Sequence, residues 1–88
     1  MVSYHIIYFG RVQGVGFRWT SSNIAKEYGV NGSVKNLADG SVELYIQGQE
    51  EQVDAVLKKI EEIMGKNITS VDKSKSDLRN FTSFDVLL

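Results

Sequence analysis

The stretch from Gly10 to Arg18 constrains the fold more than any other part of this 88-residue chain. It reads Gly-Arg-Val-Gln-Gly-Val-Gly-Phe-Arg and places three glycines within seven residues. Glycine reaches left-handed backbone angles and lets another molecule approach the main chain closely. The stretch therefore predicts a tight loop, and the segments on either side of it must supply the regular structure.

Hydrophobic periodicity predicts the elements around this loop. Apolar residues occupy both faces of residues 3–9, which is typical of a central strand. Residues 50–64 form the clearest helix, with an apolar stripe of Val53, Val56, Leu57, Ile60 and Ile63. In chain order, the expected elements are a strand over 3–9, a helix from Arg18 or Trp19 to Tyr28, strands over 32–37 and 42–47, a helix over 50–64, an edge strand over 68–73 and a possible final strand over 81–87.

The order β-α-β-β-α-β predicts an α+β, ferredoxin-like fold in a single domain over residues 1–88, with an antiparallel-mixed sheet and two helices on one face. A helix crosses between the first two strands, so these strands should run parallel. Their carboxyl ends then lie at one edge of the sheet, where ligands tend to bind. We therefore expect the loop over 10–18 to lie beside Asn36, at the end of the second strand.

The loop has the chemistry of an anion site. Successive backbone N–H groups in a glycine-rich loop can turn inward, and the following helix adds its unpaired N–H groups and positive dipole end. Arg18 stands at that helix start, where a cation is disfavoured unless an anion binds between it and the amides. The alternative is a tight turn with Arg18 in a surface salt bridge. No Gly-Lys-Ser/Thr occurs, so the loop is not a Walker A motif.

Asn36 is the second candidate. A side-chain amide both donates and accepts hydrogen bonds, so it can hold a water molecule in a fixed orientation. The alternative is an asparagine that is simply favoured next to a turn, and spacing alone does not separate the two.

Composition excludes several other functions. The net charge is −1, which argues against bulk nucleic-acid or membrane-surface binding. The chain has no cysteine and a single histidine, His5, so thiolate nucleophiles, disulfides and multi-histidine metal sites are excluded. His5 is expected to be structural. With no apolar run of membrane-spanning length and no secretory signal pattern, we expect a cytoplasmic protein.

The nine residues from Gly10 to Arg18, followed by Gly32-Ser33-Val34-Lys35-Asn36 and Asp39-Gly40-Ser41-Val42-Glu43, resemble the acylphosphatases over essentially the whole chain. The resemblance implies a hydrolase that cleaves the carboxyl–phosphate bond of small acyl phosphates. A monomer is the default expectation, and phosphate or sulfate is expected to bind as product or analogue. It implies no metal, no cofactor and no covalent phospho-enzyme. It assigns phosphoryl binding to Arg18, positioning of the attacking water to Asn36, and a cradle of backbone amides to Val12, Gln13, Gly14, Val15, Gly16 and Phe17.

Two other interpretations stay open at this stage. The same element order occurs in small ligand-binding and single-strand RNA-binding modules, although these need a basic surface and exposed aromatic residues. The second is that the chain is a detached domain that resembles the acylphosphatase-like part of a larger enzyme. Its length and initial Met1 favour a stand-alone protein.

Overall fold

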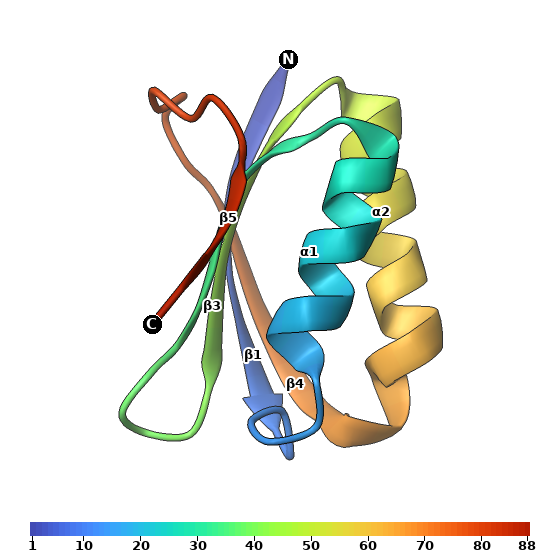
Figure 1. Ribbon diagram of the computed structural model, residues 1–88, viewed down its shortest axis with the longest axis vertical. Helices are drawn as coiled ribbons and strands as arrows, with labels where there is room; N and C mark the ends of the chain where they lie inside the picture. The colour runs from blue at the N-terminus through green and yellow to red at the C-terminus, as the bar shows by residue number, and fades with distance from the viewer.

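The computed structural model describes residues 1–88 as one sheet with two helices packed on one of its faces (Figure 1). The elements are β1 (Val2–Gly10), α1 (Phe17–Tyr28), β2 (Asn31–Asn36), β3 (Val42–Gly48), α2 (Glu50–Met64), a short 3-10 turn (Gly65–Asn67), β4 (Ile68–Lys75) and β5 (Phe84–Leu87). The expected β-α-β-β-α-β order is confirmed, and the possible final strand exists but begins at Phe84 instead of residue 81.

The strand order is β4-β1-β3-β2-β5, so β4 and β5 form the two edges. Strands β1 and β2 both pair antiparallel with β3, which lies between them. They therefore run in the same direction, as expected, and their carboxyl ends meet at one end of the sheet. The last strand, β5, pairs in parallel with β2 and makes the sheet a mixed one.

The core lies between the sheet and the helices, because alternate strand residues point toward α1 and α2. It consists of sixteen buried apolar residues. Most of the predicted stripe of α2 faces this core, including Val53, Val56 and Ile60. The prediction for Ile63 is wrong: its side chain is 52% exposed, and the neighbouring Met64 is buried in its place. Both positions fit helical spacing, and the last turn of α2 directs the methionine inward.

Gly10 closes the end of β1 against the segment that leads into β4. Its φ is 127°, and a Cβ at this position would lie 2.3 Å from the Asn67 carbonyl oxygen. The next amide, that of Arg11, donates to the same carbonyl at 2.8 Å. Only glycine allows the two backbones to approach this closely, and the contact fixes where the loop leaves the sheet.

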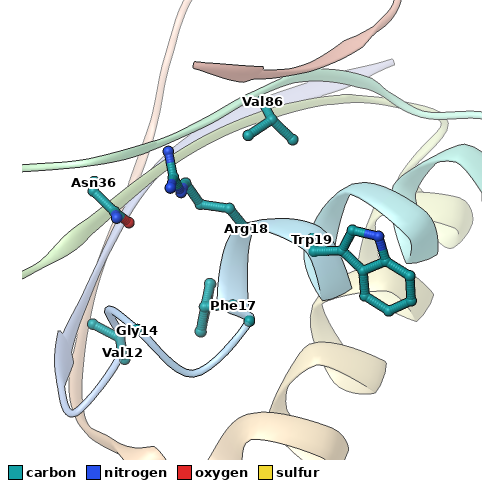
Figure 2. A pocket seen from close by; sticks show the side chains of 8 residues that line it. Val12, Gly14, Phe17, Arg18, Trp19, Asn36 and Val86 are labelled. Carbon is teal, nitrogen blue, oxygen red and sulfur yellow. The ribbon is translucent and has the colours of Figure 1, made fainter. Parts of the chain in front are cut away.

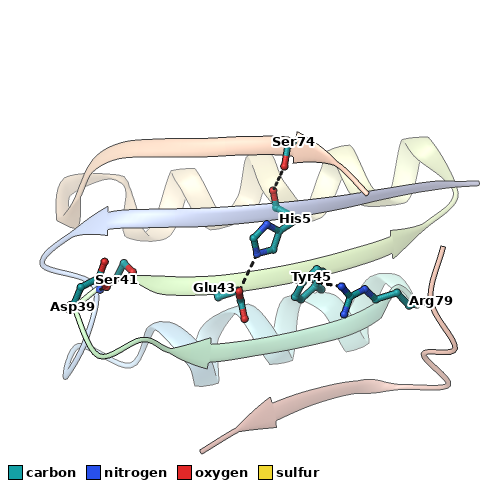
Figure 3. A network of polar contacts seen from close by, with 7 residues as sticks. All are labelled: His5, Asp39, Ser41, Glu43, Tyr45, Ser74 and Arg79. Atoms are coloured by element: carbon teal, nitrogen blue, oxygen red, sulfur yellow. Dashed lines mark hydrogen bonds and ion pairs between the residues drawn. The ribbon is translucent and has the colours of Figure 1, made fainter. Parts of the chain in front are cut away.

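The face of the sheet opposite the helices carries a polar and aromatic cluster (Figure 3). The His5 Nε2 lies 2.9 Å from Glu43 Oε2 on the neighbouring strand, and its ring stacks on Tyr45 with 4.4 Å between ring centroids. The guanidinium of Arg79 lies over the other side of Tyr45, 4.1 Å from the ring centroid. His5 therefore has structural partners far from the loop, and its carboxylate partner is distant in sequence.

The turn between β2 and β3 is closed by Asp39. Its Oδ1 accepts hydrogen bonds from the Ser41 hydroxyl and from the Ser41 amide. Both bonds lower the pKa of the Asp39 carboxyl below its ordinary value, and the bond from the hydroxyl has the larger effect.

We expect a carboxyl titration followed by NMR to place the pKa of Asp39 below that of an unstructured aspartate. Ser41→Ala should raise it, because the variant removes the larger cause and keeps the amide donor. The contribution of Asp39 to stability is present above its unfolded pKa and is lost as pH falls through the lower folded value. An unchanged pKa in Ser41→Ala would show that the hydroxyl bond does not persist in solution.

Candidate active site

A pocket of about 440 Å³ opens at the carboxyl ends of β1 and β2 (Figure 2). The expected loop, Arg18 and Asn36 all contribute to it, so the structure brings the two sequence motifs together. The pocket is lined by Val12, Gly14, Gly16, Phe17, Arg18, Trp19, Asn36 and Val86.

The backbone of the loop takes the left-handed conformations that its glycines predict. Gly14 has φ 74° and Gly16 has φ 80°, and open space surrounds the place where each Cβ would lie. These two glycines are therefore required by backbone angle and not by crowding. Gly16 also precedes α1 directly as its N-cap, and no side chain caps that helix end.

The first turn of α1 contains no acidic residue and receives no capping hydrogen bond from a side chain. The first N–H groups of a helix have no partner within it, and together with the aligned peptide dipoles they make its start attractive to anions. This end of α1 is one wall of the pocket. The electrostatic expectation from the sequence therefore agrees with the local structure.

Two buried side chains hold the loop in place at its two ends. Val12 and Phe17 are 1% and 2% exposed, and the Phe17 ring packs on Tyr8 with 4.9 Å between centroids. Burial, with a smaller effect from Glu61, raises the pKa of the Tyr8 hydroxyl well above its ordinary value. The backbone between Val12 and Phe17 is thus presented to solvent by a loop whose ends are embedded in the core.

Arg18 extends from the first turn of α1 toward β5 and Asn36 (Figure 2). Its Nη1 donates to the carbonyl oxygen of Leu87 at 2.9 Å. The side chain forms no ion pair, so the surface salt bridge considered as an alternative is absent. A guanidinium has five N–H donors in a fixed fork, and the bond to Leu87 uses one of them. The rest remain for a ligand in the pocket.

Asn36 is the last residue of β2, and its side chain is directed into the pocket (Figure 2). Its Oδ1 is buried and accepts no hydrogen bond from any protein atom. Buried side-chain acceptors are almost always paired, so this unpaired oxygen on a pocket-lining residue is unusual. Asn36 therefore brings an acceptor without a protein partner to the pocket that Arg18 also lines.

The side chain of Gln13 turns away from the pocket and joins the loop to the β2–β3 turn. Its Nε2 donates to the carbonyl oxygens of Leu37, at 2.7 Å, and of Ser41, at 2.9 Å. Sequence reasoning considered only the backbone amide of Gln13. The available signal was a polar side chain within residues 12–17, which otherwise hold only apolar residues and glycines.

Val86 and Trp19 form the apolar rim of the pocket. Val86 lies on β5, pairs with Val34 and points toward Arg18 (Figure 2). Trp19 is 73% exposed and its indole lies on the far side of Arg18 from Asn36, so it belongs to the rim and not to the core.

No group of three or more His, Cys, Asp or Glu side chains is placed to hold a metal ion. None of the helices combines the length and the apolar character needed to cross a membrane.

Comparisons of the sequence with known proteins show the family of this chain. The family model for acylphosphatases matches residues 4–86. An acylphosphatase from Lactobacillus gasseri is 43% identical over 81 residues, which cover 89% of each chain. The crystal structure of acylphosphatase from Bacillus subtilis superposes with a TM-score of 0.89 at 30% identity, over 100% of both chains. HypF from T. kodakarensis contains a similar part, with a TM-score of 0.82 and 31% identity, that is 12% of its chain.

Proposed function

This chain belongs to the acylphosphatase family, and we propose that Arg18 and Asn36 carry out its reaction. The reaction is hydrolysis of the carboxyl–phosphate bond of a small acyl phosphate, which gives a carboxylate and inorganic phosphate. It proceeds by direct attack of a positioned water on phosphorus and requires neither a metal nor a cofactor. The observation that carries this assignment is the unpaired, buried Oδ1 of Asn36 in the same pocket as the Arg18 guanidinium.

The phosphoryl group is held by the loop and by Arg18. The backbone amides from Val12 to Phe17 surround its oxygens, and the guanidinium binds two of them at once. Phosphoryl transfer passes through a loose transition state with charge spread over the three equatorial oxygens. Donors that are fixed before the substrate arrives stabilise that charge without reorganising. The buried anchors Val12 and Phe17 support this role because they hold the amides in place.

The attacking water is held by Asn36. Its Oδ1 accepts one hydrogen bond from the water, which directs an oxygen lone pair toward phosphorus on the side opposite the leaving carboxylate. Holding a nucleophile in line with its target contributes several orders of magnitude to a rate. Because Asn36 touches the water and not the phosphoryl oxygens, its contribution belongs to the chemical step more than to binding.

The leaving carboxylate needs no strong general acid, because it is stable as an anion. The proton of the attacking water passes to a phosphate oxygen of the substrate. None of the eight residues that line the pocket is an Asp, Glu, His, Cys, Lys or Tyr that could act as a general base or acid, which supports this assignment. The enzyme's part is then to position the reactants and to stabilise charge.

An assay with acetyl phosphate and excess chelator tests the function. We expect hydrolysis to proceed at the same rate with and without chelator, and kcat to change less than about threefold from about pH 5.5 to about pH 8. A side-chain base titrating in this range would instead give a tenfold slope per pH unit. Loss of activity in chelator, or such a slope, would contradict the proposed mechanism.

We propose that the protein acts as a monomer, and that the loop and the Arg18 guanidinium also bind phosphate or sulfate as product or analogue. The cytoplasmic location stays a prediction from the sequence. Binding of nucleic acid is not expected, because the net charge is −1 and the Tyr45 ring on the open sheet face is already covered by His5 and Arg79. Retention on polynucleotide resin without acyl phosphate hydrolysis would favour an RNA-binding module instead.

A further inference from the structure

We infer that Gln13 is a positioning residue whose side chain sets the place of Asn36 relative to the phosphate-binding loop. The inference rests on the proposed function, and it assigns a role to a side chain outside the pocket lining. The Gln13 Nε2 donates to Leu37 and Ser41, the residues at the two ends of the β2–β3 turn. Leu37 directly follows Asn36, so the Gln13 side chain holds the backbone one residue away from the proposed water-holding group.

These two bonds are the only hydrogen bonds between residues 11–16 and residues 36–41. The loop carries the phosphoryl group, and β2 carries the water. The two halves of the site come from segments whose other hydrogen bonds lead elsewhere, as the Arg11 amide does to Asn67. The Gln13 side chain is therefore the direct polar link that relates the electrophile to the nucleophile.

The turn does not need Gln13 in order to close. The Leu37 carbonyl also accepts from the Gly40 amide at 3.2 Å, and the Ser41 carbonyl accepts from the Leu37 amide at 2.9 Å. If the Gln13 donors are lost, both carbonyls keep a backbone partner. The turn should then stay folded but move relative to the loop, and a displacement of about 1 Å in a reacting group costs about 100-fold in rate.

The test replaces Gln13 with methionine, which keeps the length of the side chain and removes its donors. With acetyl phosphate as the probe, we expect kcat to fall about 10- to 100-fold, while KM and the inhibition constant of inorganic phosphate change less than about threefold. The split arises because the loop amides and Arg18 still bind the phosphoryl group. In an Asn36→Ala background, Gln13→Met should lower kcat further by less than about threefold, because the group that it positions is already gone.

The chain offers a matched control in Gln47. This buried glutamine also holds a backbone segment by two hydrogen bonds, donating to the Arg79 carbonyl at 2.8 Å and accepting from the Arg79 amide at 3.0 Å. It lies near the opposite end of β3, paired with Ser3 and far along the sheet from Asn36. Gln47→Met should change kcat by less than about twofold. This should hold even if Gln47→Met lowers the midpoint of urea unfolding as much as Gln13→Met does.

Three outcomes overturn the inference while leaving the proposed function in place. The first is an unchanged kcat in Gln13→Met. The second is that Gln13→Met lowers kcat by the same factor in the wild-type and in the Asn36→Ala background. The third is that Gln47→Met lowers kcat as much as Gln13→Met does. If Gln13→Met does not unfold cooperatively, Gln13→Asn takes its place, because it keeps the amide but falls one methylene short of the two carbonyls. An inactive wild-type protein would instead overturn the proposed function, and the inference with it.

Discussion

Replacing Arg18 with alanine should lower kcat/KM for an acyl phosphate by about 10³-fold or more. The guanidinium is the only cationic group that lines the pocket, and no other side chain there can take over its charge. Inhibition by inorganic phosphate should weaken about 10- to 100-fold, since hydrogen bonds to charged groups contribute about 1.5–3 kcal/mol each. Steady-state kinetics with acetyl phosphate and added phosphate measure both effects.

Arg11 provides the control for this experiment. It belongs to the same loop and carries the same charge, but its side chain is exposed and does not line the pocket. Arg11→Ala should change kcat/KM by less than about threefold, the size of a screened surface effect. Arg18→Lys keeps the charge and loses the planar fork, so it should recover only a small part of the activity. Wild-type turnover in Arg18→Ala would refute the assignment of this residue.

Replacing Asn36 with alanine should lower kcat about 10²- to 10³-fold and leave KM within about threefold of the wild-type value. The side chain holds the water and not the phosphoryl group, so phosphate inhibition should also persist. Stability should change little, because the Oδ1 that is removed has no protein partner in the folded state. Kinetics and urea unfolding of the same sample separate loss of function from loss of fold.

Asn31 is the matched control, at the other end of the same strand. Its Nδ2 donates to the Phe81 carbonyl at 3.4 Å, far from the pocket. Asn31→Ala should leave kcat unchanged. If Asn36→Ala instead raises KM strongly and leaves kcat intact, this side chain contacts the phosphoryl group. That result would refute the water-holding role.

The sequence was sufficient to predict that the loop over 10–18 and Asn36 lie together, because each placement depends on a rule that acts locally or through topology. Gly14 and Gly16 take the left-handed angles that only glycine adopts readily. The crossover helix makes β1 and β2 parallel, so the loop that follows β1 and Asn36 at the end of β2 lie at the same end of the sheet. Helix α1 begins at Phe17, one or two residues before the predicted start at Arg18 or Trp19, because the sequence pattern places Phe17 in the loop motif.

The rest could not be predicted because it depends on contacts between segments that are distant in the chain. The parallel pairing of β5 with β2 places Val86 and the Leu87 carbonyl beside Arg18, and no local pattern specifies that pairing. The two bonds of Gln13 depend on the position of a turn 24 and 28 residues away. Pairing of His5 with Glu43 likewise requires the register between β1 and β3.

The bond between Arg18 and Leu87 makes the two termini of this polypeptide unequal as attachment points, because it places the carboxyl terminus beside the pocket. A tag, a surface linker or a fusion partner joined after Leu88 would leave the molecule beside the guanidinium and would compete for the space where substrate enters. Met1 lies at the opposite end of the sheet, where β1 begins (Figure 1). An attachment at Met1 leaves the pocket accessible to solvent, so immobilised or fused forms are best made through the amino terminus.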